Sequence, residues 1–204
     1  MDNKPELNYD QKLSYKSQWW RYFGEYQYLV NLVFKSLKGS EITNVALPLA
    51  FLIRHTLEIG YKTDLLELQK VSGVTAKIEY KGKSAHKIDD LHREFEIQMR
   101  AVFKKYNAEK RLVKEFDDLN SKLVSLKRLI HKLDELSYAF RYPVANDGST
   151  LNFNTMDEKD RSDVLNFKEI KGLYDDSLKL IKYSTDVAQE IIEAYNKANG
   201  SKAS

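Results

Sequence analysis

Apolar residues recur at intervals of three and four positions along most of the chain, which is the period of an amphipathic α-helix. The pattern predicts helices over about 14–38, 43–70, 87–106 and 166–196, and a further one from a break at Asn107 to a stop at Tyr142-Pro143. This further helix has the most regular pattern, because its core positions alternate by four and three from Leu112 to Phe140. Such a seam is typical of an antiparallel helical pair or coiled coil.

Two short segments depart from this helical period. Between residues 72 and 84, apolar and polar residues alternate, which predicts a short strand, a hairpin or an exposed loop. Asn146-Asp147-Gly148, within 144–154, predicts a turn or a second small hairpin. We therefore expect an all-α fold, an antiparallel bundle of about five long helices with one or two small β-hairpin or loop insertions. It forms a single domain over 1–204, with frayed tails at about 1–12 and 198–204.

Composition excludes several classes of protein. With no cysteine, neither a disulfide framework nor a thiolate zinc site can form. No apolar run approaches the roughly 18 residues that span a bilayer, and the polar N-terminus is unlike a signal peptide, so we expect a cytoplasmic protein with no membrane contact. Glycine-rich phosphate loops and metal-binding histidine spacings are absent, which predicts no cofactor and no metal. The net charge of +3 neither offers nor excludes a basic patch for nucleic acid.

The first and second predicted helices each carry an unusual feature. Eight aromatic residues lie between Tyr9 and Tyr28, and because Trp19, Phe23 and Tyr26 follow the helical period, core packing is favoured over base stacking. Gly60 lies inside the second helix, where glycine costs about 1 kcal/mol relative to alanine. Close approach of another helix would justify that cost.

Three polar clusters are candidates for chemistry. Arg54, Glu58 and Lys62 lie at four-residue intervals on a helix that is apolar on nearly every face. They form either a surface ladder of weak ion pairs or a buried group that is paired or lines a site. His86 lies near the start of the third helix, where it either bonds a backbone group or joins Arg54 or Glu58. Arg141 ends the next helix. There its positive charge either interacts favourably with the negative end of the helix dipole or points into the same site.

Taken in chain order, these clusters resemble a HEPN domain. The segment RHTLEIGYKTDLL (54–66) is similar to the second HEPN helix, which carries an acidic residue and a lysine one turn apart before leucines. HKIDDL (86–91) resembles the H-x-L-x-x-L stretch that opens the next helix, and RYP (141–143) resembles the R-Y-P found at a helix end in some members. The resemblance covers about residues 48–143 and implies a helical bundle, often dimeric, of the kind frequent in toxin–antitoxin, phage-defence and RNA-processing systems.

Many HEPN proteins are metal-independent ribonucleases that carry an arginine followed, after four to six residues, by a histidine. Here Asn146 follows Arg141 after four residues, no histidine occurs beyond His131, and Tyr142 replaces the usual polar residue. An enzyme with this sequence would be a degenerate, metal-independent ribonuclease, and binding without catalysis is favoured.

The clusters and the resemblance together predict one polar site between the helices. The arginines and the lysine would hold phosphate, Glu58 would orient them, and His86 would act as acid or base near neutral pH. The catalytic candidates are His86, Arg141 and Glu58, and the phosphate-binding candidates are Arg54, Lys62, His55, Tyr142 and Asn146.

The predicted function is an RNA- or nucleotide-associated module of a bacterial or phage defence or toxin-type system. We expect a homodimer, with a cognate antitoxin or defence protein as partner. The alternative is a non-catalytic scaffold or interaction dimer whose buried polar network is structural and whose tyrosine- and tryptophan-rich first helix forms the partner surface. A third option is a metal-dependent hydrolase that uses His86 with Asp89 or Glu58.

Overall fold

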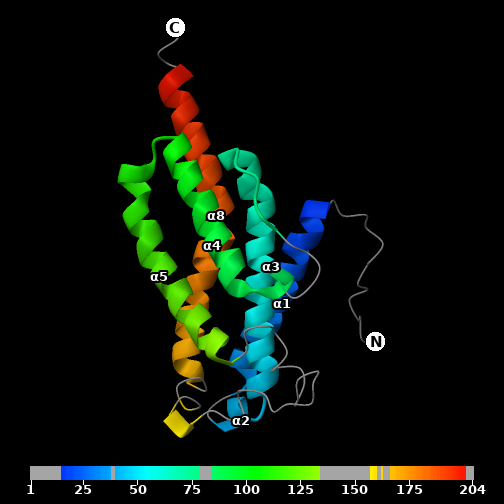
Figure 1. Cartoon of the computed structure of the whole chain (residues 1–204). Coiled ribbons are helices and arrows are strands. Elements are labelled where there is room, and N and C mark those ends of the chain that lie inside the picture. The colour runs from blue at the N-terminus through cyan, green and yellow to red at the C-terminus, as the bar shows by residue number, and fades with distance from the viewer. Residues whose placement is uncertain are drawn as a thin grey trace.

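A computed structural model describes residues 15–37, 40–78, 84–133, 157–159, 162 and 166–200 (Figure 1). Its helices are α1 (Tyr15–Ser36), α2 (Ser40–Thr43), α3 (Ala46–Ser72), the 3₁₀ turn η1 (Ser84–His86), α4 (Ile88–Lys105), α5 (Glu109–Leu133) and α8 (Phe167–Gly200). These ranges contain no strand, which confirms the all-α prediction. Of the two predicted hairpin segments, 74–78 has no regular structure, whereas 79–83 and 144–154 lie outside the described residues. No helix within the described ranges is long and apolar enough to cross a bilayer.

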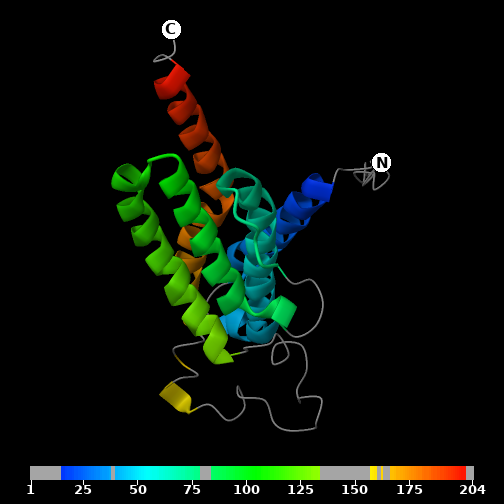
Figure 2. The same ribbon diagram turned by 45° about the horizontal axis from the view of Figure 1, so that its top comes forward.

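Helix α3 is the central element of the bundle. It packs against α1 on one side and against α4 and α8 on the others, while α5 covers α4 and α8 (Figures 1 and 2). Most of its residues from Ile53 to Leu65 are buried, including polar ones, as expected for a helix that is apolar on nearly every face. The sequence prediction of a central second helix is therefore confirmed.

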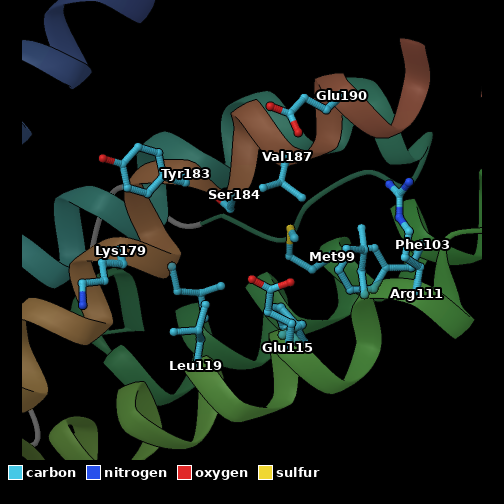
Figure 3. A pocket seen from close by; sticks show the side chains of 13 residues that line it. Met99, Phe103, Arg111, Glu115, Leu119, Lys179, Tyr183, Ser184, Val187 and Glu190 are labelled. Carbon is cyan, nitrogen blue, oxygen red and sulfur yellow. The ribbon is translucent and has the colours of Figure 1, made fainter. Parts of the chain in front are cut away.

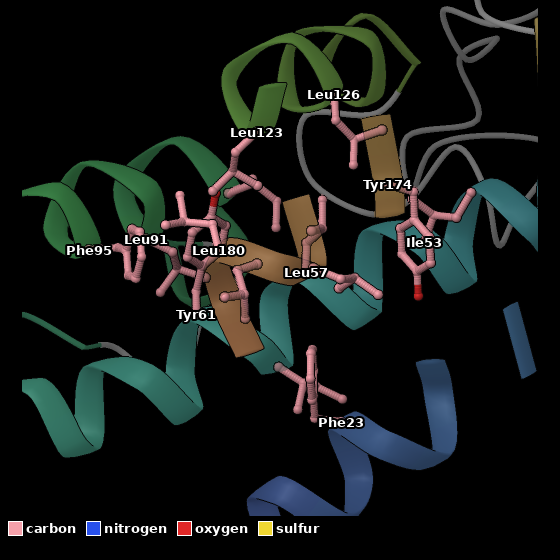
Figure 4. Packing of buried hydrophobic residues seen from close by; sticks show 14 of the residues in the cluster. Phe23, Ile53, Leu57, Tyr61, Leu91, Phe95, Leu123, Leu126, Tyr174 and Leu180 are labelled. Atoms are coloured by element: carbon pink, nitrogen blue, oxygen red, sulfur yellow. The ribbon is translucent and has the colours of Figure 1, made fainter. Parts of the chain in front are cut away.

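The hydrophobic core is built from side chains that all of the long helices contribute. Figure 4 shows Phe23 of α1 reaching α3, with residues of α4, α5 and α8 closing over the opposite side of α3. The fully buried members include Leu57, Tyr61, Leu65, Phe95, Met99, Leu123, Tyr174 and Ile181. Phe116, Leu123, Leu126 and Ile130 of the four-three seam in α5 are buried in this core, and Leu112 and Leu119 pack against it. The seam therefore joins α5 to its neighbours within the chain.

Three helices meet at Gly60. A Cβ atom at this position would lie 2.7 Å from Ile181 Cγ2 and 2.9 Å from Phe23 Cε2, both closer than such contacts occur. The sequence predicted a close helix approach here, and the structure shows α1 and α8 both pressed against the glycine. The missing side chain is what lets the central helix hold two neighbours at once.

The helix boundaries differ from the predictions by a few residues. The second long helix was predicted from residue 43, but Thr43 ends the short helix α2 and α3 begins after Val45, which makes no side-chain capping bond. Ser84 opens η1, and α4 follows Lys87. The predicted break at Asn107 is present, with φ of 55°. Helix α8 continues to Gly200, beyond the predicted end at Asn196.

A buried polar network links α3, α4 and α5 around His92. The Tyr61 hydroxyl lies 2.9 Å from His92 Nδ1, His92 Nε2 lies 3.5 Å from a Glu96 carboxylate oxygen, and Asn120 donates to Glu96 at 2.6 Å. Burial, together with the charge of Lys127 and against the opposing charges of Glu96 and Asp89, lowers the pKa of His92 to about 4. His92 is therefore neutral at pH 7, and its ring bridges the helices without bringing a charge into the core.

We expect Gly60→Ala to destabilise the protein. The added methyl group gains about 1 kcal/mol of helix propensity but overpacks the junction with Ile181 and Phe23, which typically costs about 1–3 kcal/mol. Urea unfolding followed by circular dichroism measures the difference. Gly24→Ala is the matched control, because no atom lies within 4 Å of a Cβ at Gly24 in α1, and it should be stabilising. Equal effects of the two substitutions would contradict the packing explanation.

We also expect stability to fall as the pH is lowered from about 6.5 to about 4. In this range the unfolded chain protonates His92 while the folded protein does not, so protons favour unfolding, by roughly 3 kcal/mol at pH 4. His92→Gln removes this titrating group and should flatten the profile of unfolding free energy against pH. His131→Gln, at an exposed histidine of α5, is the control and should leave the slope nearly unchanged. An unaltered slope in His92→Gln would contradict the prediction.

Candidate functional site

The middle of α3 presents a line of three charged residues. Arg54, Glu58 and Lys62 are 0%, 3% and 5% exposed. A four-residue spacing puts successive side chains on one face of a helix, and this face meets η1 and α1. The interpretation as a solvated surface ladder is thus excluded, and the interpretation as a buried, paired group is the one that the structure shows.

Glu58 is the centre of this group. Lys62 Nζ and His86 Nδ1 each donate to Glu58 Oε1 at 2.9 Å, and Arg54 Nη1 donates to Oε2 at 3.3 Å. Arg54 Nη2 also donates to the backbone carbonyl of His86. We call Arg54, Glu58, Lys62 and His86 the Glu58 cluster. Of the two predicted roles of His86, a bond to a backbone group or a contact with Arg54 or Glu58, the structure shows the second: its ring binds Glu58 and its carbonyl accepts from Arg54.

Electrostatics keep Glu58 ionised in spite of its burial. Desolvation alone would raise the pKa of Glu58, but the hydrogen bond and charge of Lys62, with the charges of His86 and Arg54, hold it below its usual value. An ionised carboxylate only accepts hydrogen bonds, so Nδ1 of His86 carries the proton of their contact. The other ring nitrogen, Nε2, is then the one that can accept a proton, and the His86 side chain is 45% exposed.

His55 borders the same cluster from the next position of α3. Its Nδ1 lies 4.0 Å from Glu58 Oε2, and its ring stacks on Phe51 with centroids 5.4 Å apart and packs edge-on against Tyr26 at 4.6 Å. Burial lowers the pKa of His55, Glu58 opposes this shift, and the nearby cations add to it. The imidazole is therefore a neutral aromatic ring at pH 7.

A pocket of about 360 Å³ opens between α1 and α3 beside the cluster. Toward its N-terminal end α1 leans away from α3 (Figure 2). The pocket is lined by residues of this part of α1. We call it the α1–α3 pocket, and it is lined by Gln18, Trp19, Tyr22, His55, Glu58, Ile59 and Lys62. Glu58 and Lys62 thus reach the pocket, whereas the fully buried Arg54 lies beneath them and His86 approaches Glu58 from η1.

The structure brings together five of the predicted site residues. Arg54, His55, Glu58, Lys62 and His86 meet around one carboxylate. The other three candidates, at 141, 142 and 146, lie outside the described residues.

Asp89, which the third option paired with His86 in a metal site, contacts basic side chains of α5 instead. It pairs with Lys127 at 2.8 Å and lies 3.4 Å from His131. Within the ranges that the structure describes, no group of three or more histidine, aspartate or glutamate side chains could hold a metal ion.

Sequence reasoning missed the aromatic wall of the pocket. Trp19 was expected in the core, but it is only partly buried and lines the pocket, and Tyr22 is 57% exposed. The excess of aromatic residues in this segment was visible in the sequence. Helical periodicity does not separate a ring that faces the core from one that faces a pocket at the edge of the core.

A second pocket, of about 320 Å³, lies between α4, α5 and α8 (Figure 3). Apolar side chains such as Met99, Phe116 and Val187 line it, and Arg111 and Glu190 lie toward one end in Figure 3. None of the predicted site residues lines it. Its polar lining includes no group in which several side chains converge on one atom, so the Glu58 cluster is the stronger candidate for chemistry.

We expect Glu58→Gln to lower the free energy of unfolding by about 3 kcal/mol or more, because it leaves the buried Arg54 and Lys62 without their counter-ion. Glu25→Gln is the matched control. Glu25 pairs with Arg21 at the same four-residue spacing on exposed α1, and its loss should cost less than about 1 kcal/mol. Guanidinium unfolding of both variants measures the contrast. Similar losses for the two would mean that burial does not decide the strength of these pairs.

Comparisons with family models, curated proteins and solved structures found no match to this chain. The likeness to HEPN domains therefore rests on the three short motifs and their order. The chemistry of the site has to be argued from its own residues.

Proposed function

We propose that this chain is a HEPN-like RNA- or nucleotide-associated module that holds a phosphate group at the Glu58 cluster. The observation that carries the proposal is the convergence of Arg54, Lys62 and His86 on a single carboxylate beside a pocket. Arg54 and Lys62 bring two permanent positive charges to a buried place, and Lys62 also borders the pocket. A phosphate group is an anion that such cations bind through charge-assisted hydrogen bonds.

The residues of the cluster take different parts in this proposal. Lys62 borders the pocket and supplies the charge that attracts phosphate. Glu58 orients Lys62 and His86, and His86 Nε2 is available to accept a proton from a ligand hydroxyl. Arg54, which the sequence predicted to bind phosphate, is fully buried and acts instead as a positioning residue that fixes η1 through the His86 carbonyl.

Binding without cleavage is the favoured form of this function, because the arginine–histidine spacing of HEPN ribonucleases is missing from the sequence. Any cleavage would be that of a degenerate, metal-independent ribonuclease, with His86 as the base. In the same proposal the chain works in the cytoplasm as a homodimer of a toxin-type or defence system, with a cognate antitoxin or defence protein as partner. This setting is supported by the motif resemblance alone.

A structural role for the same residues is the alternative, and one observation favours it. Arg54 joins α3 to η1 entirely within the protein, so part of the cluster fixes the start of α4 whether or not a ligand binds. In that case the chain is a scaffold or an interaction dimer, and Lys62 only neutralises the charge of Glu58.

Binding of RNA separates the two functions. We expect the purified chain to retain fluorescent single-stranded RNA in a salt-sensitive manner, and Lys62→Gln to weaken binding about tenfold, the loss expected for one charge-assisted contact. Lys70→Gln is the control, since Lys70 lies two turns further along α3 and pairs with Glu67 at the surface. Thermal melting checks that both variants are folded.

The same samples, incubated with EDTA, report on cleavage. RNA that is bound and remains intact supports a binding module, and cleavage that resists EDTA supports a degenerate ribonuclease. If the wild-type chain retains neither RNA nor nucleotide at low salt, the phosphate site is refuted and the scaffold function stands.

A further inference from the structure

We propose that the α1–α3 pocket holds an unpaired nucleobase, so that the ligand is single-stranded RNA or a free nucleotide and not a duplex. This inference rests on the proposed phosphate site and adds the part of the ligand that the pocket recognises. It is carried by aromatic rings and polar groups that line one cavity next to Lys62.

Aromatic rings line the pocket from both helices. Trp19 and Tyr22 come from α1 and are three residues apart, a spacing that puts both on one face of the helix. His55 contributes from α3, and the packing of its ring against Phe51 and Tyr26 fixes its orientation. Nucleobases stack on aromatic side chains irrespective of their identity, since every base has a π face.

Of these rings, Tyr22 is not part of the packing that attaches α1 to the bundle, whereas Trp19 is partly buried against the core. Phe23 and Val30 are the α1 side chains buried in the core, at 2% and 0% exposure, and Trp20 packs edge-on against Phe23 at 5.7 Å. Tyr22, in contrast, leaves more than half of its surface exposed at the pocket. A ring that adds little to the core is available to contact a ligand.

Polar side chains line the same pocket as the rings. Gln18 brings an amide that both donates and accepts, Glu58 brings an acceptor and Lys62 a donor. Donors and acceptors of this kind match the mixed hydrogen-bonding edge of a nucleobase. The base and its phosphate can thus be held side by side, with Lys62 contacting the phosphate.

The size of the pocket selects against a duplex. Its volume of about 360 Å³ is at the lower end of the range for small-molecule sites, roughly 300–1,000 Å³. A paired base is covered by its neighbours in the stack and cannot enter such a pocket, whereas an unstacked base can be splayed out into it. Discrimination between single strands and duplexes is therefore the property that a base pocket adds to a phosphate site.

Two variants of the full-length chain test this inference. Tyr22→Ala and Trp19→Ala remove the stacking surface, and each should weaken binding of a ten-nucleotide single-stranded RNA about tenfold, within the range measured for single aromatic contacts. Tyr28→Ala is the matched control, because Tyr28 is a similarly exposed tyrosine of α1 that does not line the pocket. It should change the affinity less than about twofold. If Trp19→Ala fails to fold, the exposed Tyr22 still provides the test.

A ligand series separates the base pocket from the phosphate site. We expect the single strand to bind at least about tenfold more tightly than the same strand annealed to its complement, and AMP more tightly than ribose 5-phosphate. If duplex and single strand bind equally, ribose 5-phosphate equals AMP and Tyr22→Ala has no effect, the base pocket is refuted while the phosphate site stands. If wild-type protein binds none of these ligands, including inorganic phosphate, both proposals are refuted.

Discussion

The arrangement of this protein depends on an ionised carboxylate held inside a helical bundle. Removing a charge from water costs far more than a single hydrogen bond returns, so Glu58 is tolerated only because three donors converge on it. Two donors come from its own helix, at one turn on either side. The third, His86, must be delivered by a different segment, and this requirement fixes where the chain re-enters the bundle after α3.

Close approach of α1 and α8 to Gly60 has a related consequence for the site. Because α1 is held tightly at the level of Phe23 and leans away toward its N-terminus, the two helices are in contact at Gly60 and separated beside Lys62. The α3 residues that line the pocket run from His55 to Lys62, so the pocket lies beside the same segment of α3 that contacts Phe23 and Ile181 at Gly60. The missing side chain of Gly60 therefore sets how closely α1 approaches α3 next to the pocket.

The helices and the α3 part of the site could be predicted from the sequence, because both follow from periodicity. A four-residue spacing puts Arg54, Glu58 and Lys62 on one line. Because their helix is apolar on nearly every face, these charges are buried and have to be paired. The sequence named His86 as the partner either of a backbone group or of Arg54 or Glu58. The choice between these partners, and which aromatic ring faces the pocket, depend on how separate helices pack. His92 illustrates this limit, since nothing near it in sequence indicates that its partner is Tyr61, 31 residues away on α3.

The binding and scaffold functions depend on different atoms of the same cluster. Arg54 is fully buried and donates hydrogen bonds to the His86 carbonyl and to Glu58. Its role is therefore to fix the position of η1. The atoms that water reaches are the His86 ring and the pocket-facing side of Lys62. The scaffold function gives no role to the exposed His86 side chain or to the position of Lys62 at the edge of an aromatic pocket. In the proposed binding function, Arg54 orients the cluster and the groups beside the pocket contact the ligand, which is the division that a preorganised binding site requires.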